Sequence, residues 1–368
     1  MPATAEGPVF EVRSPRALAH ALRAPGQLGL GRAYVSGELE VEDLDGVLRL
    51  LSDWKPPPLG ARARVRLVLA AVRAAGLTRP PPPPAAEIRP RGRPHSLARD
   101  RRAVRHHYDV SNEYFALFLD PSMTYSCALF SRGATTLEEA QEAKLDLVAS
   151  KLGLEGGERV LDVGCGWGSF AIHAARRGAR VVGITMSEPQ AALARERAAR
   201  AGVGERVEIR VMDYREVNDG PFDAIASIGM VEHVGEPRID LYAARLAGLL
   251  RPGGALLNHG IARLRADAGV PGPFSDRYIF PDGLPLHLSR VQAALERAGF
   301  VTEHVEGLAA DYAETLRHWI ARFDERLDDA VRLGGAERVR AWRLYLRAAR
   351  NGFETGGTSI YQVRCRRG

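Results

Sequence analysis

Three glycines follow directly on an apolar, strand-like run within residues 160–168, VLDVGCGWG. Because glycine has no side chain, Gly164, Gly166 and Gly168 permit positive φ angles and let the backbone approach a ligand closely. The helical pattern that begins after Gly168 points its free amide groups at whatever is bound there. The segment therefore predicts a nucleotide or cofactor site, although a tight strand-to-helix turn without a ligand would contain the same glycines.

The residues around this turn distinguish two kinds of cofactor. A nicotinamide site requires an acidic residue at the end of the second strand, where it binds the ribose hydroxyls. The second strand-like run, residues 181–184, is followed by Thr185, and no acid stands there. Asp162 lies instead just before the glycines, where a carboxylate can shape the loop and meet the ammonium group of S-adenosylmethionine (SAM). A plain loop-capping role for Asp162 is compatible with this, and the pattern favours a SAM site.

The elements that must position these residues follow from the pattern after about residue 140. Strand-like runs alternate with helical ones up to residue 262, and further helical patterns cover residues 289–298 and 313–350. Strands that alternate with helices indicate a parallel sheet with crossover connections. The sequence therefore predicts an α/β catalytic domain over residues 91–368, with a doubly wound, Rossmann-like sheet.

Residues 1–90 are predicted to form a smaller, mostly helical domain that ends in a proline-rich linker. A basic amphipathic helix is expected at residues 61–76, and arginines are dense in residues 89–105. Such segments suit docking on an anionic membrane surface. An ordinary solvated helix and linker would show the same composition.

The composition excludes several classes of protein. Apolar residues make up 45% and charged residues 26% of the 368, which excludes a disordered chain, a collagen-like fibre and a membrane-spanning bundle. The three cysteines, Cys127, Cys165 and Cys365, do not have the spacing of a disulfide scaffold or a structural zinc site. The first residues lack a signal-peptide pattern, so a cytoplasmic protein is expected. The net charge is +6, and only three of the 51 basic residues are lysine.

Five sequence segments resemble one family in their order and content. They are the glycine loop DVGCGWGSFAIHAA with VVGITMSEPQ after it, and residues 107–130, 227–235, 278–281 and 311–316. This set is similar to the cyclopropane-fatty-acyl-phospholipid synthases and the mycolic acid cyclopropane synthases, over roughly residues 95–366. The resemblance implies the sheet of the class I SAM-dependent methyltransferases. The first 90 residues resemble the extra domain of the phospholipid enzymes, which the mycolic acid branch lacks.

The reaction implied by the resemblance adds a methylene group to the cis double bond of a phospholipid acyl chain. The alkene attacks the SAM methyl group, a carbocation forms on the chain, and bicarbonate bound to the enzyme removes a proton so that the ring closes. The residues that correspond to the bicarbonate site of the family are Cys127, through its amide, Glu232, His259, Ile261, through its backbone, and Tyr312. Taken singly, Glu232 could be a helix cap, His259 a core histidine and Cys127 a small buried residue.

The resemblance also assigns the cofactor contacts. Tyr125 and Ser126 correspond to the carboxylate side, Asp162, Gly164 and Gly166 to the loop, Thr185 and Gln190 to the ribose side, and Asp213 to the adenine side. Trp167 could contact the cofactor or simply pack the loop. No metal is implied.

The expected partners are an unsaturated phospholipid at the inner face of the membrane and a second copy of the chain in a homodimer. No nucleic-acid-binding motif accompanies the basic charge, so nucleic acid is not expected as a partner. Two alternatives stay open. The same methylation could end in an exomethylene branch, and a non-catalytic lipid- or SAM-binding paralogue would share the motifs.

Overall fold

The computed structural model describes residues 7–53, 58, 60–75, 81–88, 92–108, 111–265 and 272–368. Residues 79 and 80 of the expected proline-rich linker and residues 89–91 of the arginine-rich stretch lie outside these ranges. Within them, no helix is both long enough and apolar enough to span a bilayer.

A seven-stranded sheet forms the centre of the catalytic part, in the order β5-β4-β3-β6-β7-β9-β8. The strands β3 to β7 pair in parallel, and β9 pairs antiparallel with both β7 and β8 at one edge. The strands are β3 (Arg159–Val163), β4 (Arg180–Thr185), β5 (Val207–Val211), β6 (Phe222–Ile228), β7 (Leu250–Ala262), β8 (Phe300–Gly307) and β9 (Ser359–Arg367). The predicted α/β, doubly wound fold is confirmed, and β8 and β9 are additional to the strands expected from the sequence.

Helices cover both faces of this sheet because alternate residues of each strand point to opposite sides. Val160 of β3 packs in one core cluster with α7, α8 and α9, whereas Leu161 packs in another with α10 and α12. These helices are α7 (Leu137–Leu152), α8 (Ser169–Arg176), α9 (Glu188–Arg200), α10 (Ile239–Leu249) and α12 (Leu288–Arg297). The 3-10 turns are η1 (Gly204–Arg206), η2 (Val231–His233) and η3 (Glu236–Arg238).

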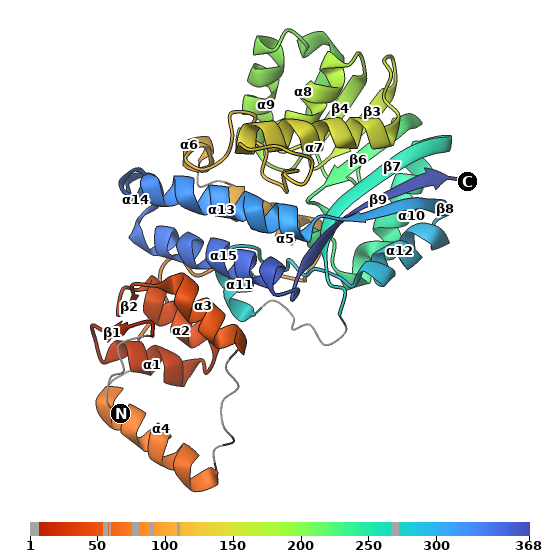
Figure 1. Cartoon of the computed structure of the whole chain (residues 1–368). Coiled ribbons are helices and arrows are strands. Elements are labelled where there is room, and N and C mark those ends of the chain that lie inside the picture. The colour runs from red at the N-terminus through yellow and green to blue at the C-terminus, as the bar shows by residue number, and fades with distance from the viewer. Residues whose placement is uncertain are drawn as a thin grey trace.

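A third helical layer lies between the sheet and the N-terminal part (Figure 1). It contains α6 (Asn112–Ala116), α11 (Pro273–Tyr278), α13 (Ala309–Glu325), α14 (Leu327–Gly334) and α15 (Ala336–Glu354). The helix expected over residues 313–350 is therefore three helices. It breaks at Arg326, whose φ of −118° is not helical, and at Gly335, whose φ of 80° is accessible mainly to glycine.

The N-terminal part forms a small unit at the opposite end of the molecule from the sheet (Figure 1). It consists of β1 (Phe10–Val12), α1 (Arg16–Arg23), α2 (Gln27–Val35), β2 (Leu39–Val41), α3 (Leu44–Asp53) and α4 (Ala61–Ala75), and α5 (Leu97–Tyr108) follows it. Its own core is small and includes Tyr34 and Val47. Arg32 binds Glu87 through two hydrogen bonds of 2.6 Å, and Arg340 of α15 donates to Glu40 at 2.9 Å, so ion pairs tie this unit to the rest of the chain.

Candidate functional site

The glycine turn lies at the carboxyl end of β3, where parallel sheets bind their ligands. Gly164 and Gly166 have φ angles of 78° and 53°, which disfavour any residue with a side chain. The amides of Gly164 and Cys165 both donate to the carbonyl of Ile184 at 2.9 Å, which joins the turn to β4. The turn is thus held open toward the cleft above the sheet.

A first cavity of about 120 Å³ runs along this turn and the end of β4. Gly164, Gly166, Thr185, Gln190 and Asp213, all predicted from the sequence, line it. The Thr185 hydroxyl donates to Oε1 of Gln190 at 2.8 Å, so the two residues after β4 are fixed relative to each other. The cavity brings the residues expected on the ribose and adenine sides together.

Asp213 is paired with an arginine that the sequence analysis did not identify. Arg215 donates to both of its carboxylate oxygens, at 2.6 and 2.7 Å, and also to Asp100 of α5 at 2.8 Å. Asp100 lines the same cavity. The Arg215 guanidinium therefore connects Asp213 to α5 at the wall of the first cavity.

A second cavity of about 70 Å³ lies on the other side of the glycine turn. Tyr125, Ser126 and Asp162, predicted at the methionine end of the cofactor, line it together with Lys144. Burial raises the pKa of Asp162 to about 7, and its Oδ2 has no hydrogen-bond partner among the described residues. Such an atom can accept a hydrogen bond from a bound ammonium group.

Trp167 packs the glycine turn and also lines a cavity. Its ring lines the second cavity and packs against Phe115, and its Nε1 donates to Asn112 Oδ1 at 2.7 Å. The indole therefore anchors the turn to α6 while forming part of the cavity wall.

A third cavity of about 550 Å³ lies between the N-terminal unit and the helical layer. Its wall is rich in aromatic rings, from Tyr125, Phe280, Tyr345 and Phe353 among others. Gly229, which follows β6, lines all three cavities. The three cavities therefore meet at this residue.

Three of the five residues expected at the bicarbonate site line the large cavity together: Glu232, Ile261 and Tyr312. The Ile261 amide donates to Glu232 Oε1 at 2.6 Å, while Oε2 has no partner among the described residues. Burial raises the pKa of Glu232 to about 7. The carboxyl group is therefore held at one oxygen and available at the other.

The other two residues, Cys127 and His259, are fully buried and are not among the described residues that line this cavity. The Cys127 thiol lies 3.7 Å from the carbonyl of Leu308, which also accepts from the Tyr312 amide, so Cys127 packs under the first turn of α13. Burial raises the pKa of the thiol well above its usual range. A thiolate nucleophile is thereby disfavoured, whereas a role through the amide needs no ionisation.

His259 is oriented by a chain of polar residues that sequence reasoning missed. Lys151 donates to Oε1 of Gln362 at 2.8 Å, and Nε2 of Gln362 lies 3.0 Å from Nδ1 of His259. Because an amide nitrogen only donates, Nδ1 is the acceptor and the ring proton is on Nε2. Burial lowers the pKa of His259 to about 3, so the ring is neutral. Nε2 has no partner among the described residues and can donate to an anion.

His233 is a further cavity residue that the sequence did not single out. Its ring lines the first and third cavities and lies 5.5 Å from the ring of Phe280. Burial lowers its pKa to about 4. A neutral His233 thus lies at the boundary between the first and third cavities.

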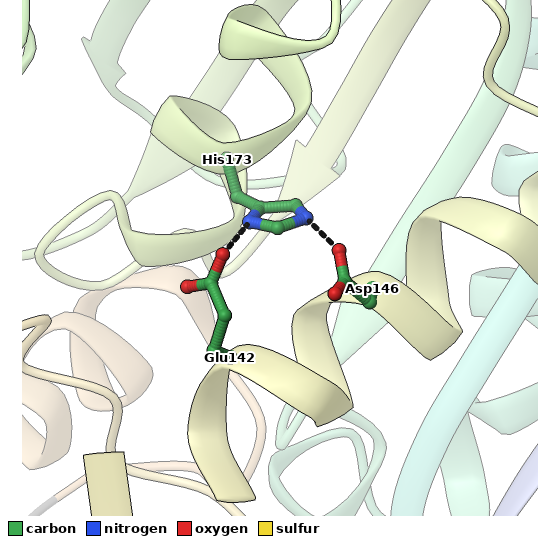
Figure 2. A group of neighbouring side chains, drawn as sticks. All are labelled: Glu142, Asp146 and His173. Atoms are coloured by element: carbon green, nitrogen blue, oxygen red, sulfur yellow. Dashed lines mark ion pairs between the residues drawn. The ribbon is translucent and has the colours of Figure 1, made fainter. Parts of the chain in front are cut away.

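A different cluster, on α7 and α8, joins Glu142, Asp146 and His173 (Figure 2). Nδ1 of His173 faces Glu142 at 3.4 Å and Nε2 faces Asp146 at 3.0 Å, and Arg177 also pairs with Asp146. Each ring nitrogen faces a different carboxylate, and these ion pairs account for the contacts of the cluster without a bound ion. The cluster is better explained as a polar bridge between the two helices.

Comparisons with known proteins agree with this geometry. The family model for mycolic acid cyclopropane synthetase matches residues 95–363. The chain is 40% identical to a Mycobacterium tuberculosis protein named "Probable fatty acid methyltransferase", over 96% of this chain and 86% of that one. It is 34% identical to the cyclopropane-fatty-acyl-phospholipid synthase of Escherichia coli, over 93% and 84%.

Among solved structures, mycolic acid cyclopropane synthase CmaA1 complexed with SAH and CTAB superposes with a TM-score of 0.69. That protein is 34% identical, and the match covers 73% of this chain and 98% of CmaA1. The sheet, the glycine turn and these relationships lead to one conclusion: the chain belongs to the mycolic acid cyclopropane synthetase family and is a SAM-dependent methyltransferase of the class I fold.

Proposed function

We propose that the protein transfers a methylene group from SAM to the cis double bond of an unsaturated phospholipid acyl chain and closes a cyclopropane ring. The observation that carries the proposal is the meeting of three cavities at Gly229. The first two have the polar groups for a nucleoside and an amino-acid end, and the third is large and aromatic. A cofactor in the first two would face an acyl chain in the third.

The residues present fit both small molecules that this reaction needs. SAM, when bound, supplies an electrophilic methyl group, and bicarbonate, when bound, supplies a base. Asp162 Oδ2, Glu232 Oε2 and His259 Nε2 are buried polar atoms without a partner among the described residues. Buried polar groups are normally hydrogen-bonded, so these atoms support one ligand beside the glycine turn and another beside β7.

The chain's own residues would hold the second ligand by complementary donors and acceptors. With its pKa at about 7, Glu232 is poised to exchange a proton through the oxygen that Ile261 does not bind. His259 offers an N–H, and the phenol of Tyr312 is at the cavity wall. We propose that these groups, with the Cys127 amide, bind bicarbonate.

The large cavity would protect the positive charge that develops on an acyl chain when its double bond attacks a methyl group. The faces of aromatic rings attract cations, and Tyr125 and Tyr345 are in the cavity wall. A lining of this kind also excludes water, which would trap a carbocation. The residues therefore favour transfer to an alkene inside this aromatic cavity.

Docking on a phospholipid membrane is supported by α4, at the outer end of the N-terminal unit (Figure 1). Val65, Leu67, Val68 and Leu69 are each more than half exposed, and the helix contains four arginines and no acid. Gln27 and Ser52 of the same unit line the large cavity. We propose that the unit binds the inner face of the membrane and guides one acyl chain inward.

Two binding measurements test the partners. Sedimentation with anionic phospholipid vesicles should retain the protein in the pellet, and saturable RNA binding at physiological salt would count against a membrane partner. The homodimer expected from the resemblance is also proposed, and light scattering of the purified chain should give the mass of two chains.

An exomethylene-branched acyl chain is the second candidate product. The relative named for fatty acid methylation, which aligns over 96% of this chain, supports it. Both products add one CH₂, so their masses are equal. Proton NMR of the acyl methyl esters, after reaction with SAM and monounsaturated phospholipid, should show high-field ring protons; olefinic methylene protons would identify the branched product instead.

A further inference from the structure

Lys144 of α7 is a buried cation that the proposed chemistry leaves without a role. Its side chain is 1% exposed and lines the second cavity beside the glycine turn. A lysine in such a place is uncommon, because burying an ammonium group costs solvation energy. Only three of the 51 basic residues of the chain are lysine, so a general need for positive charge does not explain the choice.

The contacts of Lys144 leave part of its donor capacity open to the cavity. Its Nζ donates to the hydroxyl of Ser126 at 3.0 Å. Among the described residues, no carboxylate is hydrogen-bonded to it or within ion-pair distance, although Asp120 and Asp162 are near enough to favour its charged form. An ammonium group has three donors, and a buried cation without a paired anion is unfavourable. Two donors of the Lys144 ammonium group are therefore available to an anionic group in the cavity.

Asp162 supplies the opposite charge in the same cavity. Its carboxyl group is 2% exposed, and Oδ2 has no partner among the described residues. A cavity with one ammonium and one carboxyl group matches a zwitterion, the form of an α-amino acid. The cavity also shares Gly164, Gly166 and Gln190 with the nucleoside cavity, so one ligand could fill both.

We propose that Lys144, together with Ser126, binds the α-carboxylate at the methionine end of the cofactor, opposite an ammonium group at Asp162. The inference rests on the proposed use of this cleft for SAM, and it assigns the residue that recognises the carboxylate. Burial lowers the pKa of Lys144 to about 8, while Asp120 and Asp162 act in the opposite direction. A bound carboxylate would further favour the charged form.

A comparison of three ligands isolates the contribution of the carboxylate to binding affinity from that of the rest of the cofactor. S-adenosylhomocysteine has both charged groups, its decarboxylated analogue keeps only the ammonium, and methylthioadenosine has neither. By calorimetry, the full-length wild type should bind the decarboxylated analogue roughly 10- to 100-fold more weakly than S-adenosylhomocysteine. The Lys144→Met substitution should weaken the binding of S-adenosylhomocysteine by a similar factor and leave the affinities for the other two ligands unchanged.

A matched control is Lys151→Met, which removes a partly buried lysine of the same helix that is not a described lining residue of this cavity, and it should leave S-adenosylhomocysteine affinity unchanged. Equal loss of affinity for all three ligands in Lys144→Met would show a structural role and overturn the proposal. If that variant does not fold, the wild-type series decides, because equal affinity for the first two ligands excludes any carboxylate contact. If the wild type binds none of the three, the assignment of the cleft to SAM is wrong instead.

Discussion

Gln362 and His259 are direct neighbours across β9 and β7, and the Gln362 amide donates to Nδ1 of the His259 ring at 3.0 Å. Lys151 holds the amide oxygen, so the side chain of Gln362 cannot flip without losing that bond. The pair places the ring proton on Nε2, the nitrogen available to an anion. A residue on the last strand of the chain thus sets the donor of the proposed bicarbonate site.

Gln362→Met should lower kcat roughly 10- to 100-fold, the usual effect of removing a group that orients another residue. S-adenosylhomocysteine affinity should not change, because Gln362 is not a described lining residue of either cofactor cavity. Nitrogen-15 NMR of the imidazole gives a direct readout, since a mixture of tautomers should replace the single Nε2–H form. An unaltered tautomer together with full activity would refute this role.

Glu232→Gln should abolish turnover while leaving SAM binding largely intact. The amide could still accept from Ile261, but it could not exchange a proton at the proposed anion site. Initial rates with monounsaturated phospholipid vesicles and calorimetry with S-adenosylhomocysteine measure the two properties separately. Retention of full activity would count heavily against the assigned bicarbonate site.

The stability of the protein should depend on pH through Glu232. Burial raises its pKa from 4.5 to about 7, so the native state keeps a proton that the unfolded chain releases above pH 4.5. The contribution of this proton to the free energy of unfolding is full below pH 4.5 and is lost as the pH rises through 7. Relative to Glu232→Gln, the wild type should lose up to about 3 kcal/mol over this range.

Urea unfolding of the ligand-free wild type and Glu232→Gln between pH 4.5 and 8 measures this difference. Comparing the two proteins removes the contributions of other titrating groups that they share. If the free energies of unfolding of the two proteins differ by a constant amount across the whole pH range, burial does not raise the pKa of the Glu232 carboxyl group.

The ion pair between Arg32 and Glu87 should stabilise the packing of the N-terminal unit against the rest of the chain. Both side chains are largely buried, at 11% and 2% exposure, and two hydrogen bonds join them. Arg32→Met would leave the charge of Glu87 buried without its partner, which should lower the free energy of unfolding by about 3 kcal/mol. Arg200→Met, which removes an ion pair with Glu196 that is exposed on both sides, should change it by less than about 0.5 kcal/mol. Thermal unfolding of both variants tests this, and equal melting temperatures would contradict it.

Much of the catalytic fold could be predicted because its buried parallel strands and amphipathic helices leave strong local patterns. The antiparallel edge was harder to predict, since β8 is mostly exposed and reads as a polar segment. Helix α2 was missed because its sequence, QLGLGRAYV, contains two glycines that weaken the helical signal. Helix α7 is buried on several sides, so its residues lack one clear polar face.

Residues of the candidate site could be predicted where they lie in a recognisable sequence motif. Residues that reach the site only through tertiary contacts could not. The glycine turn and Glu232 lie in recognisable segments. Lys144 and Gln362 act through neighbours 18 and 103 residues away, Ser126 and His259, and no local pattern reveals such contacts. The scarcity of lysine was the one sequence signal that could have drawn attention to Lys144.

The most direct test uses SAM labelled with carbon-13 in its methyl group, phospholipid vesicles with monounsaturated chains, and buffer either depleted of bicarbonate or supplied with it. We predict that the label appears in the acyl chains and that the rate rises to saturation as bicarbonate is added. Absence of label from the acyl chains in both buffers would contradict one-carbon transfer to a lipid. Label that accumulates at the same rate in both would contradict the proposed anion site of Glu232, His259 and Tyr312.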